Sequence, residues 1–211
     1  MNVKDIASAL VGLDDEKVKA LVRDALSSGI EPETVLKQGL IPGITEVGRL
    51  FSCKEYFVPE VLVAAETFYA GFDILKPALK KDPFPDRGKI MICVVEGDIH
   101  DIGKNIVKVL TEAAGFGVID LGKDVQTAAL MDAVFKEKPR ILCLSALMTT
   151  TMTIMETIIH QIKKRNPDWR LQIIIGGAPV SADYAARIGA DGYAPDAGTA
   201  VALIDRLTHE K

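Results

Sequence analysis

The stretch KIMICVVEGDIHDIGKN, residues 89–105, decides the fold of this chain. Residues 89–96 form an apolar run that predicts a buried β-strand, and an amphipathic helical pattern begins near residue 102. Between them lies a polar loop in which His100 stands between two aspartates. A strand, a loop and a helix in this order make the first unit of an alternating α/β fold.

The same alternation continues along the rest of the chain. Five apolar runs that alternate strictly with helical stretches predict a doubly wound parallel sheet of the flavodoxin-like or Rossmann-like class. Ligands of such sheets bind at the carboxyl ends of the strands. Strands are expected at 89–96, 117–122, 140–147, 172–177 and 191–195, helices from about 102, 127, 151, 181 and 197, and candidate loops at 97–103, 122–127, 145–151, 176–180 and 193–196.

Residues 1–80 show helical patterns only. Asp14 is a predicted N-cap, and Pro32 and Pro59 each stand at a first-turn position. With a short leading helix this makes about four helices, enough for a small bundle that forms an N-terminal domain at 1–80. A proline-rich linker at 81–88 then precedes the α/β domain at 89–211.

Composition excludes several classes of protein. The 211 residues are 48% hydrophobic and 26% charged, which suits a folded chain with a sizeable core. A net charge of -4 without a basic stripe gives no reason to expect nucleic acid, and no apolar run approaches the length of a membrane span. The N-terminus lacks the pattern of a signal peptide, and the three cysteines are isolated, so we expect the cytoplasm.

Phosphate and phosphoryl chemistry fit the strand-end loops poorly. Five residues separate Gly97 from Gly103 where a P-loop has four, and Asn105 replaces its hydroxyl residue. The dinucleotide fingerprint is absent. A receiver domain needs an acceptor aspartate after the third strand, where Ser145 stands, and a flavodoxin needs hydroxyl residues where this first loop has carboxylates.

His100 has three readings on these residues alone. Asp98, two residues earlier, can bond one imidazole nitrogen and raise the basicity of the other, which suits a metal ligand or a general base. A zinc site lacks a second histidine or cysteine, because His160 and His209 are expected on the surface. A single protein ligand suits a metal that a macrocycle already holds. A structural loop histidine is the third possibility.

Three short motifs together resemble the signature of cobalamin-binding proteins. They are Asp98-x-His100-x-x-Gly103, Ser145-x-Leu147 and Gly176-Gly177, each at a different strand end. VGRLFSCKEYFVPEVLVAAETF, residues 47–68, is similar to the helical cap that precedes the cobalamin domain in methionine synthase and in small corrinoid proteins of methyltransferase systems. The resemblance therefore covers nearly the whole chain.

The resemblance implies a site for cobalamin in its base-off, His-on form. It makes His100 the lower axial ligand of cobalt, with Asp98 and Thr151 behind it as a relay. Ser145 and Thr149 line the nucleotide-tail pocket, and Gly176 and Gly177 lack side chains where the tail approaches the backbone. The full cofactor-binding set is Gly97, Asp98, Ile99, His100, Asp101, Ile102, Gly103, Ser145, Leu147, Thr149, Gly176, Gly177, Ala178, Tyr193 and Asp196.

The cap is expected to shield the upper face of the corrin, with the linker as a hinge. The candidates for that face are Phe57, Phe68, Tyr69 and Phe72, although Phe68 and Phe72, one turn apart, also suit an ordinary helical core.

The function that the resemblance implies is a methyl carrier. The cobalamin cycles through cob(I)alamin, cob(II)alamin and methylcobalamin while it shuttles a methyl group between a substrate-specific corrinoid methyltransferase and a second methyltransferase, to tetrahydrofolate or coenzyme M. A reductive activase is a third partner. The chain is not expected to turn over alone. The alternatives are the cobalamin subunit of an adenosylcobalamin-dependent mutase and a cobalamin-dependent regulator.

Overall fold

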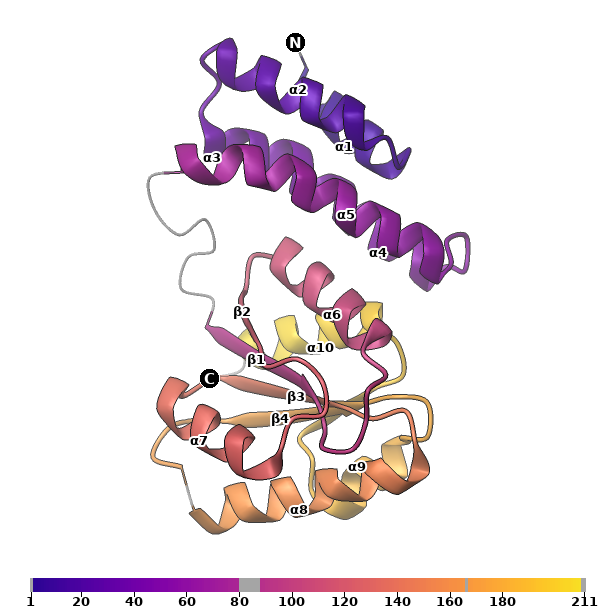
Figure 1. The fold of residues 1–211 in the computed structure, drawn as a ribbon, viewed down its shortest axis with the longest axis vertical. Helices are drawn as coiled ribbons and strands as arrows, with labels where there is room; N and C mark the ends of the chain where they lie inside the picture. Colours follow the sequence, from indigo (N-terminus) through magenta and orange to yellow (C-terminus); the bar gives the residue numbers. More distant parts are fainter. Residues whose placement is uncertain (1, 80–87, 166, 210–211) are drawn as a thin grey trace. The chain divides into compact units, whose positions relative to one another are not determined.

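The computed structural model describes residues 2–79, 88–165 and 167–209 (Figure 1). They form two compact units, one built from helices and one from a sheet with helices on both faces. Of the predicted linker 81–88, all but Gly88 lies outside the described residues.

The helical unit contains the four helical runs that the sequence predicts. Asp14 caps the second helix, because its carboxylate accepts a hydrogen bond from the Lys17 backbone N–H at 3.0 Å. The elements are α1 (Lys4–Val11), α2 (Asp15–Ser27), α3 (Pro32–Val35), a π-helical turn (Leu36–Leu40), α4 (Ile41–Ser52), α5 (Val58–Leu75) and a 3₁₀ turn (Lys76–Ala78).

The π-helical turn has a cause in the sequence. Residues 32–52 are helical throughout although Pro42 stands in their middle. A proline inside an α-helix has no N–H to donate and its ring collides with the carbonyl four residues earlier. The wider turn at Leu36–Leu40 directly precedes it and accommodates the ring, so the helix continues.

Apolar side chains hold the helical unit together. Leu36, Leu40, Phe68 and Leu75 are fully or almost fully buried. Gly43 lets two helices approach closely, because a Cβ there would lie 3.0 Å from the Ala7 Cα of α1. Among the unit's described residues, Thr67 is the one polar side chain in the core.

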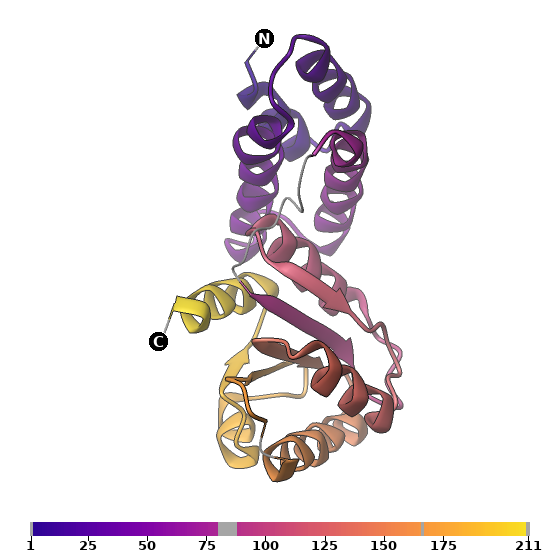
Figure 2. The ribbon, with the colours of Figure 1, turned by 90° about the vertical axis from the view of Figure 1, so that its left-hand side faces the viewer.

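The α/β unit has the predicted fold, with five parallel strands in the order β2-β1-β3-β4-β5 (Figure 2). Helices α7, α8 and α9 cover one face of the sheet, and α6 and α10 cover the other. The elements are β1 (Lys89–Val94), α6 (Ile102–Ala113), β2 (Gly117–Asp120), α7 (Thr127–Glu137), β3 (Ile141–Ser145), α8 (Thr149–Arg165), β4 (Gln172–Gly176), α9 (Ala182–Ile188), β5 (Gly192–Ala194) and α10 (Ala197–His209).

The strand order determines where a ligand binds. The chain leaves β1 toward β2 on one side and then returns to place β3 on the other side of β1. The crevice between the carboxyl ends of β1 and β3 is the topological switch point of such a sheet. The loop that carries His100 follows β1, and the loop from Ser145 to Thr149 follows β3.

Candidate functional site

Asp98 is the centre of the polar network at the switch point. Its side chain is fully buried. One carboxylate oxygen, Oδ2, accepts hydrogen bonds from the backbone N–H groups of Leu147 at 2.7 Å and Met148 at 3.2 Å. The Thr151 hydroxyl donates to the same oxygen at 2.7 Å. The carboxylate therefore lies at the N-terminus of α8, where backbone donors and the helix dipole favour an anion.

The other oxygen of Asp98 holds His100. Oδ1 lies 2.8 Å from the imidazole Nδ1 and accepts the His100 backbone N–H at 3.1 Å. Because an ionised carboxylate can only accept, Nδ1 carries the proton, and Nε2 keeps its lone pair for a ligand. The His100 side chain is 47% exposed, so Nε2 belongs to a ring that solvent or a ligand can reach.

The hydrogen bonds keep Asp98 ionised. Burial by itself would raise the pKa of this carboxyl group, but the bonds from Thr151, Leu147 and His100 outweigh it. They hold the pKa of Asp98 well below its usual range. A permanent negative charge behind the imidazole makes Nε2 a stronger electron donor.

Three apolar side chains in the histidine loop, at the start of α6 and in the loop after β3 are not buried. Ile99 is 62% exposed, Ile102 53% and Leu147 46%. Gly103 opens further space, because a Cβ added to it meets nothing within 4 Å. The fold itself therefore does not require glycine at this position. Exposed apolar groups and open space around one free imidazole nitrogen fit a large, flat, partly apolar ligand.

The two glycines at the end of β4, Gly176 and Gly177, are required by the protein's own backbone. A Cβ on Gly177 would lie 1.8 Å from the Ala146 carbonyl oxygen, and its φ of +125° is one that side chains rarely adopt. A Cβ on Gly176 would lie 3.0 Å from the Ala194 carbonyl oxygen. Close packing of neighbouring strand ends therefore explains both residues before any ligand is considered.

Some of the remaining predicted site residues lie at the strand ends, and others make contacts within the fold. Ser145 is half-buried and Thr149 and Ala178 are exposed at strand ends on the same edge. Asp196 has a structural task, since its carboxylate accepts the Thr199 backbone N–H at 2.8 Å and caps α10. Tyr193 is half-buried and packs against the core under α7, α8 and α9. Asp101 pairs with Lys123 at 3.5 Å.

The aromatic candidates for the upper face of the corrin differ in how deeply they are buried. Phe68 is 1% exposed and its ring stacks on Phe72 at a centroid distance of 5.9 Å, so it belongs to the core of the helical unit. Tyr69 and Phe72 are half-buried. Phe57 is 63% exposed at the start of α5, beside the exposed Val58.

Sequence reasoning missed a buried ion pair next to the site. Lys104 is 3% exposed, and its ammonium group lies 2.7 and 2.6 Å from the two carboxylate oxygens of Asp120. Burial would raise the pKa of Asp120, but the bonds from Lys104 and the Gly122 N–H lower it. The pair ties the first turn of α6 to the end of β2. Its partners lie 16 residues apart, and no motif signals the pairing.

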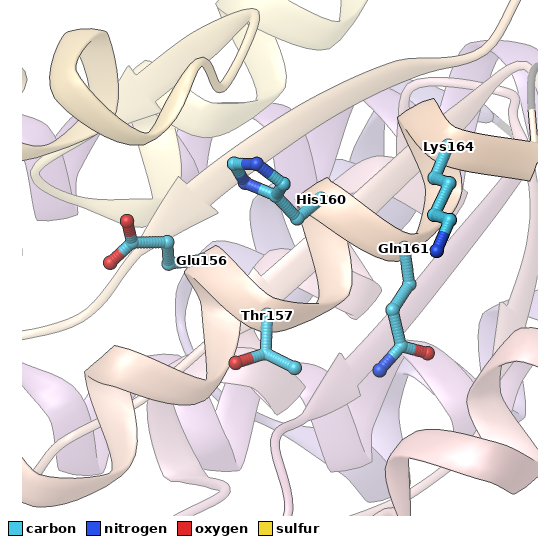
Figure 3. A pocket seen from close by; sticks show the side chains of 5 residues that line it. All are labelled: Glu156, Thr157, His160, Gln161 and Lys164. Carbon is cyan, nitrogen blue, oxygen red and sulfur yellow. The ribbon is translucent and has the colours of Figure 1, made fainter.

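The described residues contain no second candidate metal site. Within 2–79, 88–165 and 167–209, no three His, Cys, Asp or Glu side chains are grouped to hold a metal ion. Burial raises the pKa values of the Cys93 and Cys143 thiols to about 12, so both stay protonated. Among the described residues, the lining of a surface hollow comes from α8, namely from Glu156, Thr157, His160, Gln161 and Lys164 (Figure 3). No helix in the described part of the chain is long and apolar enough to cross a membrane.

Comparison with known proteins accounts for this arrangement. A model of the B12 binding domain matches residues 88–202, and a second B12 binding domain model matches residues 3–76. The chain belongs to the B12-binding family. This confirms the family that the three motifs and the cap predict, and cobalamin is the cofactor.

Members of the family resemble the chain over nearly its whole length. The trimethylamine corrinoid protein of Methanosarcina barkeri is 39% identical over 198 residues, which cover 93% of this chain and 91% of the relative. A crystal structure of a cobalamin-binding protein from Desulfitobacterium hafniense DCB-2 is 34% identical with a TM-score of 0.77, and covers 97% of this chain and 98% of its own. The methanol:cobalamin methyltransferase complex MtaBC of M. barkeri matches with 30% identity and a TM-score of 0.87, over 99% of this chain and 80% of the matched chain.

Proposed function

We propose that this protein carries a methyl group on cobalamin between two methyltransferases. One observation carries the proposal: the B12-binding chain presents a single imidazole, held by a buried carboxylate, at the switch point of its sheet. Its relatives support the methyl-carrying role, because they include a trimethylamine corrinoid protein and a chain of a methanol:cobalamin methyltransferase complex.

In this proposal Nε2 of His100 is the lower axial ligand of cobalt, with the cofactor bound base-off and His-on. Bound cobalamin supplies a cobalt centre that accepts a methyl group and gives it up again. Asp98 fixes the tautomer of His100 by accepting the Nδ1 proton, and Thr151 and the α8 N-terminus fix Asp98. The imidazole is therefore oriented before the cofactor arrives.

Exposed apolar side chains and open space beside His100 define the rest of the proposed pocket. Ile99, Ile102 and Leu147 offer apolar surface to the corrin around His100. Gly103 leaves room for the cofactor where a side chain would intrude. Ser145, Thr149, Gly176, Gly177 and Ala178 line the path of the nucleotide tail.

Shielding of the upper face of the corrin stays a prediction for the helical unit. Among the aromatic candidates, Phe57 suits this role best because it is 63% exposed, while Phe68 is committed to the core of the helices. Shielding the upper face would protect a methyl group on cobalt from water and light.

The partners are a substrate-specific methyltransferase, a second methyltransferase and a reductive activase that restores oxidised cobalt. The first of these enzymes selects the methyl donor, and the carrier accepts the group whatever its source. The cytoplasm suits such a carrier, since its cysteines are free thiols.

The test is reconstitution of the full chain with hydroxocobalamin. We expect one cobalt per chain after gel filtration, release of intact cobalamin by acid, and methyl transfer only when a cognate methyltransferase is added. The His100→Ala variant should retain its fold and lose histidine coordination of cobalt. A folded wild-type protein that stays colourless after incubation would overturn the proposal.

A further inference from the structure

The loop from Gly122 to Thr127, between β2 and α7, runs beside the loop that carries His100. Val95 forms a parallel bridge with Val125, and the Glu96 carboxylate accepts both the N–H and the hydroxyl of Thr127 at 2.9 Å. Further along, Lys123 lies 3.5 Å from Asp101. Contacts therefore follow the histidine loop from its beginning to its end, although neither loop is part of a regular strand.

Asp124 is the central residue of this contact. Its carboxylate Oδ1 accepts the Gly97 backbone N–H at 2.7 Å, and its own backbone N–H donates to the Asp98 carbonyl oxygen at 2.9 Å. These two bonds hold the backbone on both sides of Asp98. Asp124 reaches them with a φ of +51°, a conformation that aspartate and asparagine adopt more readily than most residues.

The position of His100 depends on the backbone that Asp124 holds. The Asp98 side chain is fixed by α8, but the backbone that carries it turns at Gly97, where φ is +80° and rotation is easy. His100 follows Asp98 by two residues, and both of its bonds go to the Oδ1 atom of Asp98. Without the Asp124 contacts, the turn at Gly97 could move the imidazole while Asp98 kept its partners at α8.

We propose that Asp124 is a positioning residue for the cobalt ligand: it braces the Gly97–Asp98 backbone from the neighbouring loop and so sets where His100 Nε2 is presented. This rests on the proposed role of His100 as the axial ligand. The brace itself is a property of the protein without its cofactor and can be measured there.

Four variants of the full chain separate the parts of the brace. Asp124→Asn keeps the acceptor oxygen and the tolerance for positive φ, Asp124→Gly keeps only the backbone freedom, and Asp124→Ala keeps neither. Asp132→Ala, an exposed aspartate on α7, is the matched control for loss of a charge. Circular dichroism establishes that each variant is folded.

Two readouts follow the brace and its consequence. In the cofactor-free protein, the amide shift and exchange rate of Gly97 report its hydrogen bond to Asp124, and the ring ¹⁵N shifts of His100 report the contact of the imidazole with Asp98. In the cobalamin-loaded protein, the electron paramagnetic spectrum of cobalt(II) gives the ratio of nitrogen-coordinated to uncoordinated cobalt. The ring shifts of His100 and the cobalt(II) spectrum do not respond to a general loss of stability in a protein that remains folded, and the Asp132→Ala control shows how far amide exchange does.

We expect Asp124→Ala and Asp124→Gly to lower this ratio about tenfold, the effect of losing roughly one hydrogen bond to a charged acceptor. Asp124→Asn and Asp132→Ala should stay within about twofold of the wild type. In the cofactor-free protein, the Gly97 amide should exchange faster only in the Ala and Gly variants. A ratio in Asp124→Ala equal to that of the wild type would overturn the inference, as would an Asn variant as impaired as the Ala variant.

The two proposals fail in different ways. A wild-type protein that binds cobalamin without an axial histidine nitrogen contradicts the role of His100. In that case the His100 ring shifts in the cofactor-free variants still decide whether Asp124 positions the imidazole: a change in Asp124→Ala supports the brace, and unchanged shifts overturn it.

Discussion

The helical unit and the α/β unit bury their polar groups differently. Among the described residues of the helical unit, the core contains a single polar side chain, Thr67, whose hydroxyl has no partner. In the α/β unit, the hydroxyl of buried Thr111 is likewise without a partner, but Asp98, Lys104 and Thr151 are buried and each makes a hydrogen bond to a residue distant in sequence. Apolar packing thus maintains the first unit, while the second also carries a polar network at the carboxyl ends of its strands.

The largest effect should come from removing apolar volume from the helical core. Phe68→Ala leaves a cavity where the ring stacked on Phe72, and we expect the unit to lose about 4 kcal/mol of stability. Amide exchange in α2 and α5 measures this loss, and Phe57→Ala is the control because Phe57 is 63% exposed. A loss below about 1 kcal/mol would mean that the helical unit does not depend on this packing.

The corresponding change in the polar network is Asp98→Ala. It leaves the N–H groups of Leu147 and Met148 without their acceptor and leaves the Thr151 hydroxyl with only the Met148 carbonyl oxygen in reach, and we expect a cost of about 3 kcal/mol. Urea unfolding followed by the fluorescence of Trp169, the one tryptophan of the chain, reports on this unit. Asp132→Ala, on the surface of α7, should leave the midpoint nearly unchanged. Equal midpoints for the two variants would contradict the network.

Substitutions at two glycines of the site distinguish a glycine that the fold requires from a glycine that a ligand would require. Gly177→Ala should cost about 2 kcal/mol, because its Cβ collides with the Ala146 carbonyl oxygen and its φ is +125°. Gly103→Ala should instead stabilise the cofactor-free protein by up to about 1 kcal/mol, since it lies within α6 and the space around it is open. If Gly103 makes room for cobalamin, the same change weakens cofactor binding. Unchanged binding would remove Gly103 from the site.

The last effect concerns the Lys104–Asp120 pair, and it depends on pH. The folded protein lowers the pKa of Asp120 from its usual 3.8, so the stabilisation is present above pH 3.8 and is lost as the pH falls through the folded value. Asp120→Asn should therefore lose less stability than the wild type as the pH falls below 3.8, as followed by Trp169 fluorescence. Because Asp120 is 20% exposed, we expect a coupling to Lys104 of only about 1–2 kcal/mol. Parallel acid unfolding of wild type and variant would argue against the pair.

Local patterns were sufficient to predict most of the fold. Periodicity and proline positions predict the helices at Pro32 and Pro59. Apolar runs that alternate with helices predict all five strands and their parallel direction. Some bounds differ by two residues, since α8 begins at Thr149 and not near residue 151, and β1, β2 and β3 each end two residues before the predicted end. The sequence does not predict the π-helical turn before Pro42, because such a turn is required only if the helix continues past the proline.

The site was less accessible to sequence reasoning because its contacts join distant residues. The Asp-x-His spacing indicates that Asp98 can reach His100, and the structure has that contact at 2.8 Å. The backbone donors of Leu147 and Met148 carry no side-chain signal, and they appear only when β1 and β3 lie side by side. Phe68 shows a second difficulty. The sequence pattern of an aromatic residue on a helix does not distinguish a core position from a ligand contact, and the structure places Phe68 in the core.

The most direct measurement labels the histidines of the full-length protein with ¹⁵N and records the electron paramagnetic spectrum of its cobalt(II) form with unlabelled cobalamin. If His100 Nε2 is the axial ligand, the nitrogen splitting changes from a triplet to a doublet on labelling, and it disappears in His100→Ala. A triplet that survives the label would show that the cofactor's own base coordinates cobalt, and would contradict the role assigned to His100.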